Sequence, residues 1–321
     1  MQIITSHQIK SLNISPIQCV EWVLEAFLMK DKCQLPAKMS VHPQGNDFFT
    51  TMPCLLPEEY GRFGVKVVSR INGKQPALKS DLMLFDTVNG ELLALIDCDW
   101  ITAMRTGAVA ALAIQTLKSS TAEQYAFVGL GSTARATLRC LLATGINELH
   151  HIKLLRYKHQ AEKIVDEFSS FLNADFSIVN TTEELVADSD VVVSCITDAS
   201  GLLVEDLNLF KPGVLIVPVH TRGFQNCDVV FDKVFADDTA HVQGFKYFAQ
   251  FREYHEIGDV LSGRVKGRTS DNERILSYNI GLGLHDVLYA HKIYNEIMKN
   301  PPPRFAQPLI YNHLQICRTA A

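Results

Sequence analysis

The sequence predicts an α/β protein in which a doubly wound parallel sheet is joined to a second domain of mixed α+β structure. Strand-like and helix-like segments alternate over residues 122–284, as expected where helices connect parallel strands. Residues 1–118 do not alternate in this way and instead contain several consecutive strand-like segments. A glycine-rich turn at 129–131 lies early in the alternating region, where a strand runs into a helix.

Length and composition are those of an ordinary soluble protein. The chain has 321 residues, 47% of them hydrophobic and 20% charged, and a net charge of −5, which gives no basic surface for nucleic acid. The longest nearly apolar stretch, 107–114, is too short to span a membrane, and the amino terminus lacks the layout of a signal peptide. The eight cysteines are scattered, which favours reduced thiols in a cytoplasmic protein over a metal site.

Residues 1–118 are expected to form the mixed domain. Residues 16–30 are expected to form a helix, because Pro16 suits a first helical turn and apolar residues then recur at helical spacing. Ser15 can cap this helix. Val88-Asn89-Gly90 is typical of a hairpin turn. The predicted strands are 48–52, 64–71, 82–87 and 92–97.

An alanine-rich helix at 99–117 leads through a polar stretch into the second domain, residues 119–284. A long helix at 275–298 is expected to carry the chain back onto the first domain, which residues 285–321 complete. Pro301-Pro302-Pro303 is expected to end that helix. The predicted strands of the second domain are 124–128, 151–155, 176–179, 191–195, 214–217 and 233–236, in parallel pairing.

The turn that follows strand 124–128 has the pattern of a dinucleotide-binding site. Gly129 allows a tight turn, Gly131 lets the backbone approach a pyrophosphate, and the small Ala134 lets helix and strand pack closely. The amide groups at the start of the helix then face the phosphates. The pattern predicts a Rossmann dinucleotide site, with a plain strand–turn–helix as the alternative.

The end of the second strand favours NADP(H) over NAD(H). An acidic residue usually binds the ribose of NAD at this place, whereas an arginine binds the 2′-phosphate of NADP. Here the strand is followed by Arg156 and Lys158, with no acid among residues 154–159. The alternative for these two cations is a solvated polar turn.

Two cations stand in otherwise small or apolar surroundings. Lys66 lies inside an apolar strand, where burial can lower its pKa and make it a proton donor or acceptor, unless it reaches water at a strand edge. Arg105, followed by Thr106, lies in the alanine-rich helix and suits the binding of a carboxylate or phosphate. A salt bridge from Arg105 to Asp97 or Asp99 is the alternative.

The loops after the fourth and fifth strands are further candidates, because ligands of doubly wound sheets bind at the carboxyl ends of the strands. His220, Thr221 and Arg222 follow the fifth strand, and Thr197 and Asp198 follow the fourth. We expect some of these residues to contact the nicotinamide or the substrate.

In combination and order, several motifs resemble the ornithine cyclodeaminase/mu-crystallin family over about residues 30–290. The resemblance implies a Rossmann domain, a nicotinamide cofactor and a homodimer built through the first domain. The motifs are Met52-Pro53, Gly64-Val65-Lys66, Asp86 with Asn89-Gly90, residues 102–107, Gly129-Leu130-Gly131, and Asn279-Ile280-Gly281 with Asp286.

The resemblance also implies roles for single residues. Lys66 would meet the substrate carboxylate and help with proton transfer, and Arg105 would lie between that carboxylate and the cofactor phosphate. Asn279 and Ile280 would close the pocket. The cofactor would contact Arg105, Thr106, Ser132, Thr133, Arg156, Thr197, Val219 and His220.

Three residues depart from the family pattern. Lys38 stands where the family usually has a carboxylate-binding arginine, and Ala77 stands where a Thr or Ser is expected. Arg222 occupies the place of the acid/base Asp of cyclodeaminases, and an arginine is a poor general base. This departure argues against ornithine cyclodeamination unless His220 substitutes.

The leading hypothesis is an NAD(P)H-dependent oxidoreductase that acts on the C=N or CH–NH bond of a small amino or imino acid. Lys66, Arg105 and either Lys38 or Arg222 would hold one or two substrate carboxylates, and Lys66 or His220 would transfer the proton. The alternatives are a lyase of the cyclodeaminase type that uses its cofactor catalytically, and a protein that binds NADP(H) without turnover.

Overall fold

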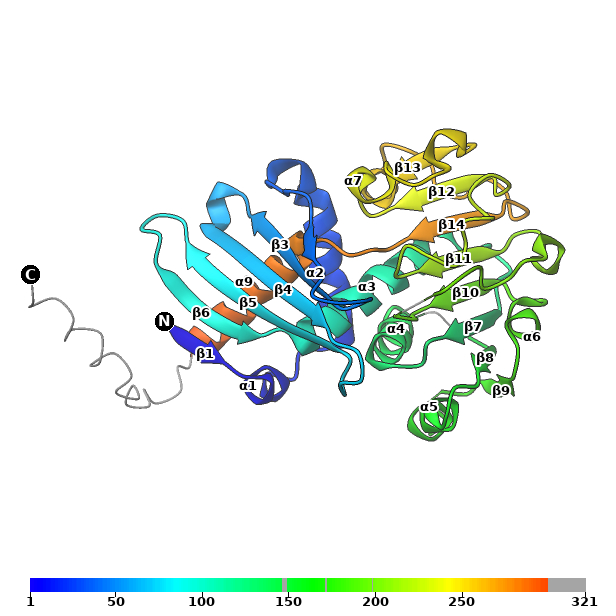
Figure 1. Ribbon diagram of the computed structural model, residues 1–321, viewed down its shortest axis with the longest axis horizontal. Coiled ribbons are helices and arrows are strands. Elements are labelled where there is room, and N and C mark those ends of the chain that lie inside the picture. The colour runs from blue at the N-terminus through cyan, green and yellow to red at the C-terminus, as the bar shows by residue number, and fades with distance from the viewer. Residues whose placement is uncertain (146–148, 171, 198, 300–321) are drawn as a thin grey trace, which may run out of the picture.

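The computed structural model describes residues 1–145, 149–170, 172–197 and 199–299, and contains two sheets side by side (Figure 1). Helix α3 (Asp99–Leu117) lies between them and leads from the first sheet to the second. The predicted domain boundary at residue 118 falls at the end of this helix, and the division into two domains remains a prediction.

The first sheet is mixed, as predicted, and has six strands in the order β1-β6-β5-β4-β3-β2. Strand β1 pairs with β6 in parallel, and all other neighbours are antiparallel. The short outer strands β1 and β2 were not predicted. The strands are β1 (Gln2–Ile4), β2 (Met39–Val41), β3 (Phe48–Leu55), β4 (Arg62–Arg70), β5 (Leu78–Asp86) and β6 (Leu92–Asp97).

One face of this sheet is covered by helix α9 (Gly283–Lys299), which packs on β3, β4 and β5 (Figure 1). Lys66 stands opposite Met52 on β3 and Leu82 on β5, so its side chain points to this covered face. Helix α2 (Pro16–Met29) packs on α9 and begins with the predicted cap, because the Ser15 side chain accepts from the backbone of Gln18.

The second sheet is parallel throughout, in the order β13-β12-β14-β11-β10-β7-β8-β9. Its strands are β7 (Gln124–Val128), β8 (His151–Leu155), β9 (Asp175–Val179), β10 (Val191–Ser194), β11 (Leu215–Pro218), β12 (Lys233–Ala236), β13 (Tyr254–Glu256) and β14 (Ile275–Tyr278). The other helices are α1 (Ser6–Ser11), α4 (Ser132–Ala143), α5 (Gln160–Phe168), α6 (Thr182–Val186), α7 (Thr239–Val242) and α8 (Ile257–Leu261). No described helix is long and apolar enough to cross a membrane.

The predicted long helix at 275–298 is wrong at its start. Residues 275–278 form β14, which is fully buried between β11 and β12. A short apolar run of this kind fits a buried strand as well as a helix, so periodicity could not separate them. Gly281 (φ +89°) then turns the chain, and α9 returns to the first sheet as predicted. Pro301-Pro302-Pro303 lies outside the described residues.

Helices α3 and α4 cross at very short range. A Cβ atom on Gly107 of α3 would lie 2.6 Å from the backbone of Ala136 and Thr137 on α4, so no other residue fits there without a shift.

The strand order of the second sheet reverses between β7 and β10, because β8 and β9 extend to one side and β11 to the other. Such a reversal opens a crevice at the carboxyl ends of the strands.

Candidate functional site

The glycine turn has the geometry that a diphosphate requires. Gly129 has φ +79°, and a Cβ atom there would lie 2.5 Å from the backbone of Cys195 and Ile196. Around Gly131, by contrast, a Cβ atom would meet nothing within 4 Å. Helix α4 begins at the next residue, and Ala134 is buried beneath its first turn. The free amides of α4 therefore face open space, which fits a phosphate group.

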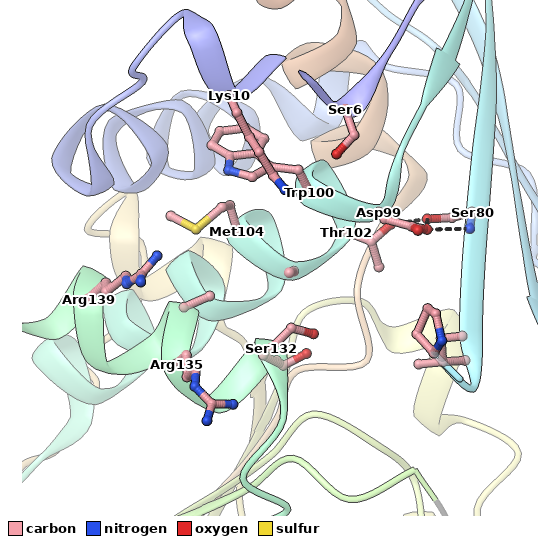
Figure 2. A pocket seen from close by; sticks show the side chains of 15 residues that line it. Ser6, Lys10, Ser80, Asp99, Trp100, Thr102, Met104, Ser132, Arg135 and Arg139 are labelled. Atoms are coloured by element: carbon pink, nitrogen blue, oxygen red, sulfur yellow. Dashed lines mark hydrogen bonds between the residues drawn. The ribbon is translucent and has the colours of Figure 1, made fainter. Parts of the chain in front are cut away.

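Two cavities flank this turn. One, of about 550 Å³, is lined by Gly129, Gly131, Arg156 and Thr197, which the sequence placed at a cofactor. The other, of about 430 Å³, is lined by Ser132 and Thr133 of α4 and by Thr102 of α3. Figure 2 shows Ser132 at the start of its helix, across this second cavity from Thr102 and from the hydrogen-bonded pair Asp99 and Ser80.

Arg156 lies at the first cavity but is already bonded. Its guanidinium pairs with Glu162 of α5 and donates to Asn180 Oδ1 at 3.2 Å. Lys158 has φ +51° and holds its ammonium over the Tyr157 ring, 5.2 Å from the centroid. Residues 154–159 contain no acid, and the acid that pairs with Arg156 is Glu162, in the first turn of α5. The cofactor preference therefore remains a prediction.

Lys66 and Arg105 share one buried carboxylate. Lys66 Nζ lies 2.7 Å from Asp286 Oδ2, and Arg105 Nε lies 3.0 Å from Asp286 Oδ1. Lys66 and Asp286 are 0% exposed and Arg105 is 4% exposed. Both alternatives from the sequence are wrong, because Lys66 does not reach water and Arg105 does not pair with Asp97 or Asp99. Those two acids pair with Lys79 instead.

The protonation of this cluster follows from burial and charge. Burial, reinforced by the neighbouring Arg105, lowers the pKa of Lys66. Burial alone would raise the pKa of Asp286, but the charges of Arg105 and Lys66 hold it below its usual value. Lys66 also donates to Thr102 Oγ1 at 3.5 Å. Thr102 thus connects the buried lysine to the cavity of Figure 2.

Lys38 and Ile280 meet at the same region. Lys38 Nζ donates to the Ile280 carbonyl at 3.0 Å, and burial lowers the pKa of Lys38 to about 8. The next residue, Gly281, donates its amide to the buried Asp237, whose other oxygen lies 3.0 Å from His241 Nδ1. A Cβ atom on Gly281 would lie 1.9 Å from the Arg105 guanidinium, so only glycine leaves room for that side chain.

The residues after β10 and β11 gather at a third cavity, of about 210 Å³, which Thr197, His220 and Arg222 line. His220 Nε2 lies 2.6 Å from Ser194 Oγ, and burial lowers the pKa of His220 to about 4.

The remaining predicted site residues make backbone contacts. The backbone amides of Val219 and Asn279 donate hydrogen bonds to neighbouring strands. Thr106 donates to the Thr102 carbonyl at 2.6 Å within α3. Asp198 lies outside the described residues.

Sequence reasoning assigned no role to Asp286, Asp237 or Arg70, which the structure places among these groups. Asp286 was visible as an acid inside the apolar run 282–290, a pattern that signals a buried partner. Asp237 follows β12 at the same sheet edge as the other candidates. Arg70, at the end of β4, lines both the 550 Å³ and the 210 Å³ cavity. Nothing in its local sequence distinguishes it.

We expect Asp286→Asn to destabilise the fold strongly, because it leaves Lys66 and Arg105 buried without their carboxylate. Removing one partner of a buried ion pair costs about 3–5 kcal/mol. Urea denaturation measures the change, and Asp259→Asn is the matched control. Its pair with the exposed Arg264 should contribute little to stability, because solvent screens the two charges. Equal losses in the two variants would contradict the buried arrangement.

His220 should make stability depend on pH. Between its ordinary value of 6.5 and its folded pKa of about 4, the unfolded chain binds a proton that the folded protein rejects, so stability falls as pH drops through this window. In His220→Gln, the stability lost between pH 7 and pH 5 should be smaller by about 1–2 kcal/mol. Denaturation at both pH values tests this, with exposed His7→Gln as control. An unchanged loss in His220→Gln would show that the ring is not shielded.

Comparison with known proteins identifies the family. The chain is 26% identical over 282 residues to the nodulation efficiency protein NfeD of Rhizobium meliloti, covering 81% of this chain and 83% of that protein. It is 27% identical over 259 residues to a Δ(1)-pyrroline-2-carboxylate reductase of Bacillus thuringiensis subsp. konkukian, covering 74% and 78%. The fold matches the Thermococcus litoralis Δ(1)-pyrroline-2-carboxylate reductase in complex with NADH and L-proline, with TM-score 0.82, 23% identity and coverage of 93% and 98%. The family model for ornithine cyclodeaminase/mu-crystallin matches residues 1–300, so the chain belongs to this family.

Proposed function

We propose that the protein is an NAD(P)H-dependent oxidoreductase that acts on the C=N or CH–NH bond of a small imino or amino acid. One observation carries the proposal. One cavity is lined by both Thr102 and Ser132. Thr102 accepts a hydrogen bond from Lys66, and Ser132 is the first residue of α4. The buried cation cluster therefore lies near the start of α4, where a diphosphate would be expected to bind. The reductase named among the relatives supports the same chemistry.

The residues present fit a nicotinamide dinucleotide. Gly129, Gly131 and the amides of α4 would hold the diphosphate, and Thr197 lies on the side where the nicotinamide half is expected. Arg156 and Lys158 favour NADP(H), with NAD(H) as the alternative, because Glu162 already neutralises part of the arginine charge. When bound, the dinucleotide supplies the hydride that converts C=N to CH–NH.

The cation cluster is suited to one substrate carboxylate. Lys38, Lys66 and Arg105 carry three positive charges, and Asp286 and Asp237 carry two negative ones. One positive charge is left, which matches a single α-carboxylate. Such a contact orients the imine carbon, and burial strengthens it because little water competes.

Lys66 is the better candidate for the proton that the substrate nitrogen gains. Its lowered pKa lets it give up a proton more readily than an exposed lysine, and Asp286 can stabilise the exchanged charge. His220 is neutral at physiological pH because its pKa is about 4, so it is a poor acid there and a weak base. The same property counts against the lyase alternative, in which His220 would have to replace the missing Asp.

The proposal predicts that imino acids oxidise NADPH in the presence of this protein. We expect net loss of NADPH absorbance with Δ(1)-pyrroline-2-carboxylate or with a 2-oxo acid plus an amine, and slower loss with NADH. Lys66→Met should lower kcat by at least about 100-fold, the usual contribution of a proton-transfer group. Lys79→Met is the control, since that lysine lies on the adjacent strand and is 54% exposed.

Other outcomes separate the alternatives. Product formation without net absorbance change would indicate a lyase with catalytic cofactor use. Tight NADPH binding without turnover of any substrate in the panel would indicate a binding protein. Full activity of Lys66→Met would show that Lys66 does not transfer the proton.

We also propose a homodimer formed through the first sheet. The face opposite α9 exposes apolar side chains near both edges of the sheet, with Ile3 beside Leu95 at one edge and Val41 beside Phe49 at the other. Ile3 is 64% exposed and Val41 61%, and exposed apolar side chains gathered on one face are typical of a protein–protein interface. Light scattering should give twice the chain mass, and Leu95→Glu should shift it to the monomer. The control Leu202→Glu changes an exposed leucine outside this sheet. A monomeric wild type would overturn the proposal.

A further inference from the structure

We propose that two hydroxyl groups, those of Thr102 and Ser80, form a proton relay to Lys66. The relay connects this buried amine with the partly exposed carboxylate of Asp99. The inference rests on the proposed function and goes beyond it, because a lysine that gives a proton to the substrate must recover one before the next turnover. Thr102 and Ser80 act through Lys66 and have no assigned part in the hydride step.

The carboxylate partner of Lys66 does not lead to the surface. Lys66 Nζ lies 2.7 Å from Asp286 Oδ2, and both side chains are 0% exposed. The other oxygen of Asp286 contacts Arg105, which is also buried. This contact therefore leads only to further buried groups. Lys66 has a second contact, at 3.5 Å to Thr102 Oγ1, and this one leads outward.

Two hydrogen bonds continue the outward path from Thr102. Ser80 Oγ lies 2.9 Å from Thr102 Oγ1 and 3.3 Å from Asp99 Oδ1. Ser80 is 3% exposed, whereas the side chain of Asp99 is 32% exposed. Figure 2 shows these three residues together on one wall of the 430 Å³ cavity. The path thus runs from a fully buried lysine to a carboxylate that water reaches.

Local geometry brings the members of the relay together. Asp99 and Thr102 are three residues apart in the first turn of α3, so they lie on one face of the helix. Leu82 pairs with Lys66 across β4 and β5, and Ser80 is two residues before it, so Ser80 and Lys66 point to the same face of the sheet. The backbone amide of Ser80 also donates to Asp99 Oδ1 at 2.7 Å, which fixes the outer end of the relay.

The hydrogen bonds of the relay have one consistent direction. The Ser80 hydroxyl has a single proton, which it donates to the Asp99 carboxylate. Thr102 is then the donor in its 2.9 Å contact with Ser80. Its contact with Cys98 Sγ is longer, at 3.9 Å, and sulfur is a weak acceptor. Because Thr102 accepts from Lys66, each group donates to the next one outward.

This order allows a proton to move without a net change at either hydroxyl. In the oxidation direction, Lys66 passes a proton to Thr102, and Thr102 passes its own to Ser80. Ser80 passes its own to Asp99, which releases it to water. In imine reduction, Lys66 gives a proton to the substrate nitrogen and becomes a neutral amine. The hydroxyls then rotate, Asp99 takes a proton from water, and the same transfers run inward.

Lys79 also contacts Asp99 but lies outside the relay. Its ammonium is 2.7 Å from Asp99 Oδ2, the oxygen that Ser80 does not use, and its side chain is 54% exposed. Ser80 already holds Asp99 Oδ1 through two hydrogen bonds. Substitution of Lys79 therefore leaves the path to Lys66 continuous.

Removal of the Thr102 hydroxyl tests the relay, with the full-length protein, NADPH and the imino acid that it reduces fastest. We expect Thr102→Val to lower kcat at least about tenfold, with little change in KM, which is less than the loss of the proton donor itself. The solvent deuterium isotope effect on kcat should increase, because return of the proton to Lys66 becomes the slow step. Thr102→Ser keeps the hydroxyl and should restore both quantities.

Ser80→Ala is the second variant and should produce the same two effects. Since both hydroxyls belong to one path, the double variant should be no slower than the slower single variant. Thr116→Val is the matched control, because Thr116 is a half-buried threonine of the same helix whose hydroxyl donates to the Leu112 carbonyl at 2.7 Å. It should leave kcat and the isotope effect unchanged.

Two outcomes would overturn the relay while leaving the reductase proposal intact. The first is an unchanged kcat in both Thr102→Val and Ser80→Ala. The second is a lower kcat with an unchanged solvent isotope effect, which would indicate that the hydroxyls only support the structure around Lys66.

If no imino acid is reduced, the proposed function fails, and proton exchange decides the inference separately. Lysine labelled with ¹⁵N allows exchange of the Lys66 Nζ protons with D₂O to be followed by NMR, and Lys66→Met assigns the signal. Exchange should be at least about tenfold slower in Thr102→Val than in the wild type, because it then requires local opening of the structure. Equal exchange rates in the two proteins would refute the relay.

Discussion

The arrangement depends on one buried carboxylate. Asp286 lies between Lys66 of β4 and Arg105 of α3, so a single side chain ties α9 to both elements. Without it, both cations would be buried with no carboxylate beside them, and an unpaired buried charge is costly. Since only residues 279–282 separate β14 from α9, the same contact holds the end of the second sheet against the first. The ion cluster thereby determines where the crevice lies and which groups face it.

The positively charged side chains along that crevice differ in burial and in how far nearby acids neutralise them. The innermost are compensated and shielded from water, which keeps them oriented and gives Lys66 and Lys38 lowered pKa values. The outermost, Arg222, is solvated and uncompensated among the described residues. A substrate anion that enters from solvent would thus meet exposed charge first and buried charge last. Association and precise positioning would then be served by different side chains.

Local signals predicted the elements well and the tertiary partners poorly. The start of α2 could be predicted because its cap involves residues of a single helical turn, Ser15, Pro16 and Gln18. The Gly129 turn could be predicted because it depends on the steric fit between adjacent backbone segments. Strand 275–278 was misread because four apolar residues carry no usable period. Lys66 and Asp286 are far apart in the sequence and meet only in the folded chain, so no spacing rule could pair them. Arg156 and Glu162 are close in the sequence, but they meet only because of the direction in which α5 leaves the strand. Lys66 and Arg105 could be singled out as buried cations, but their shared partner could not.

The contact at Gly107 has a mechanical consequence. Because backbone meets backbone where α3 crosses α4, neither helix can slide along the other without collision. Arg105 is two residues from that crossing, and Ser132 is four residues from Ala136 on the other helix. This contact therefore holds the Arg105 side of α3 at a fixed spacing from the start of α4. Any movement of one sheet against the other would have to leave this contact intact, so the two helices would move as one unit.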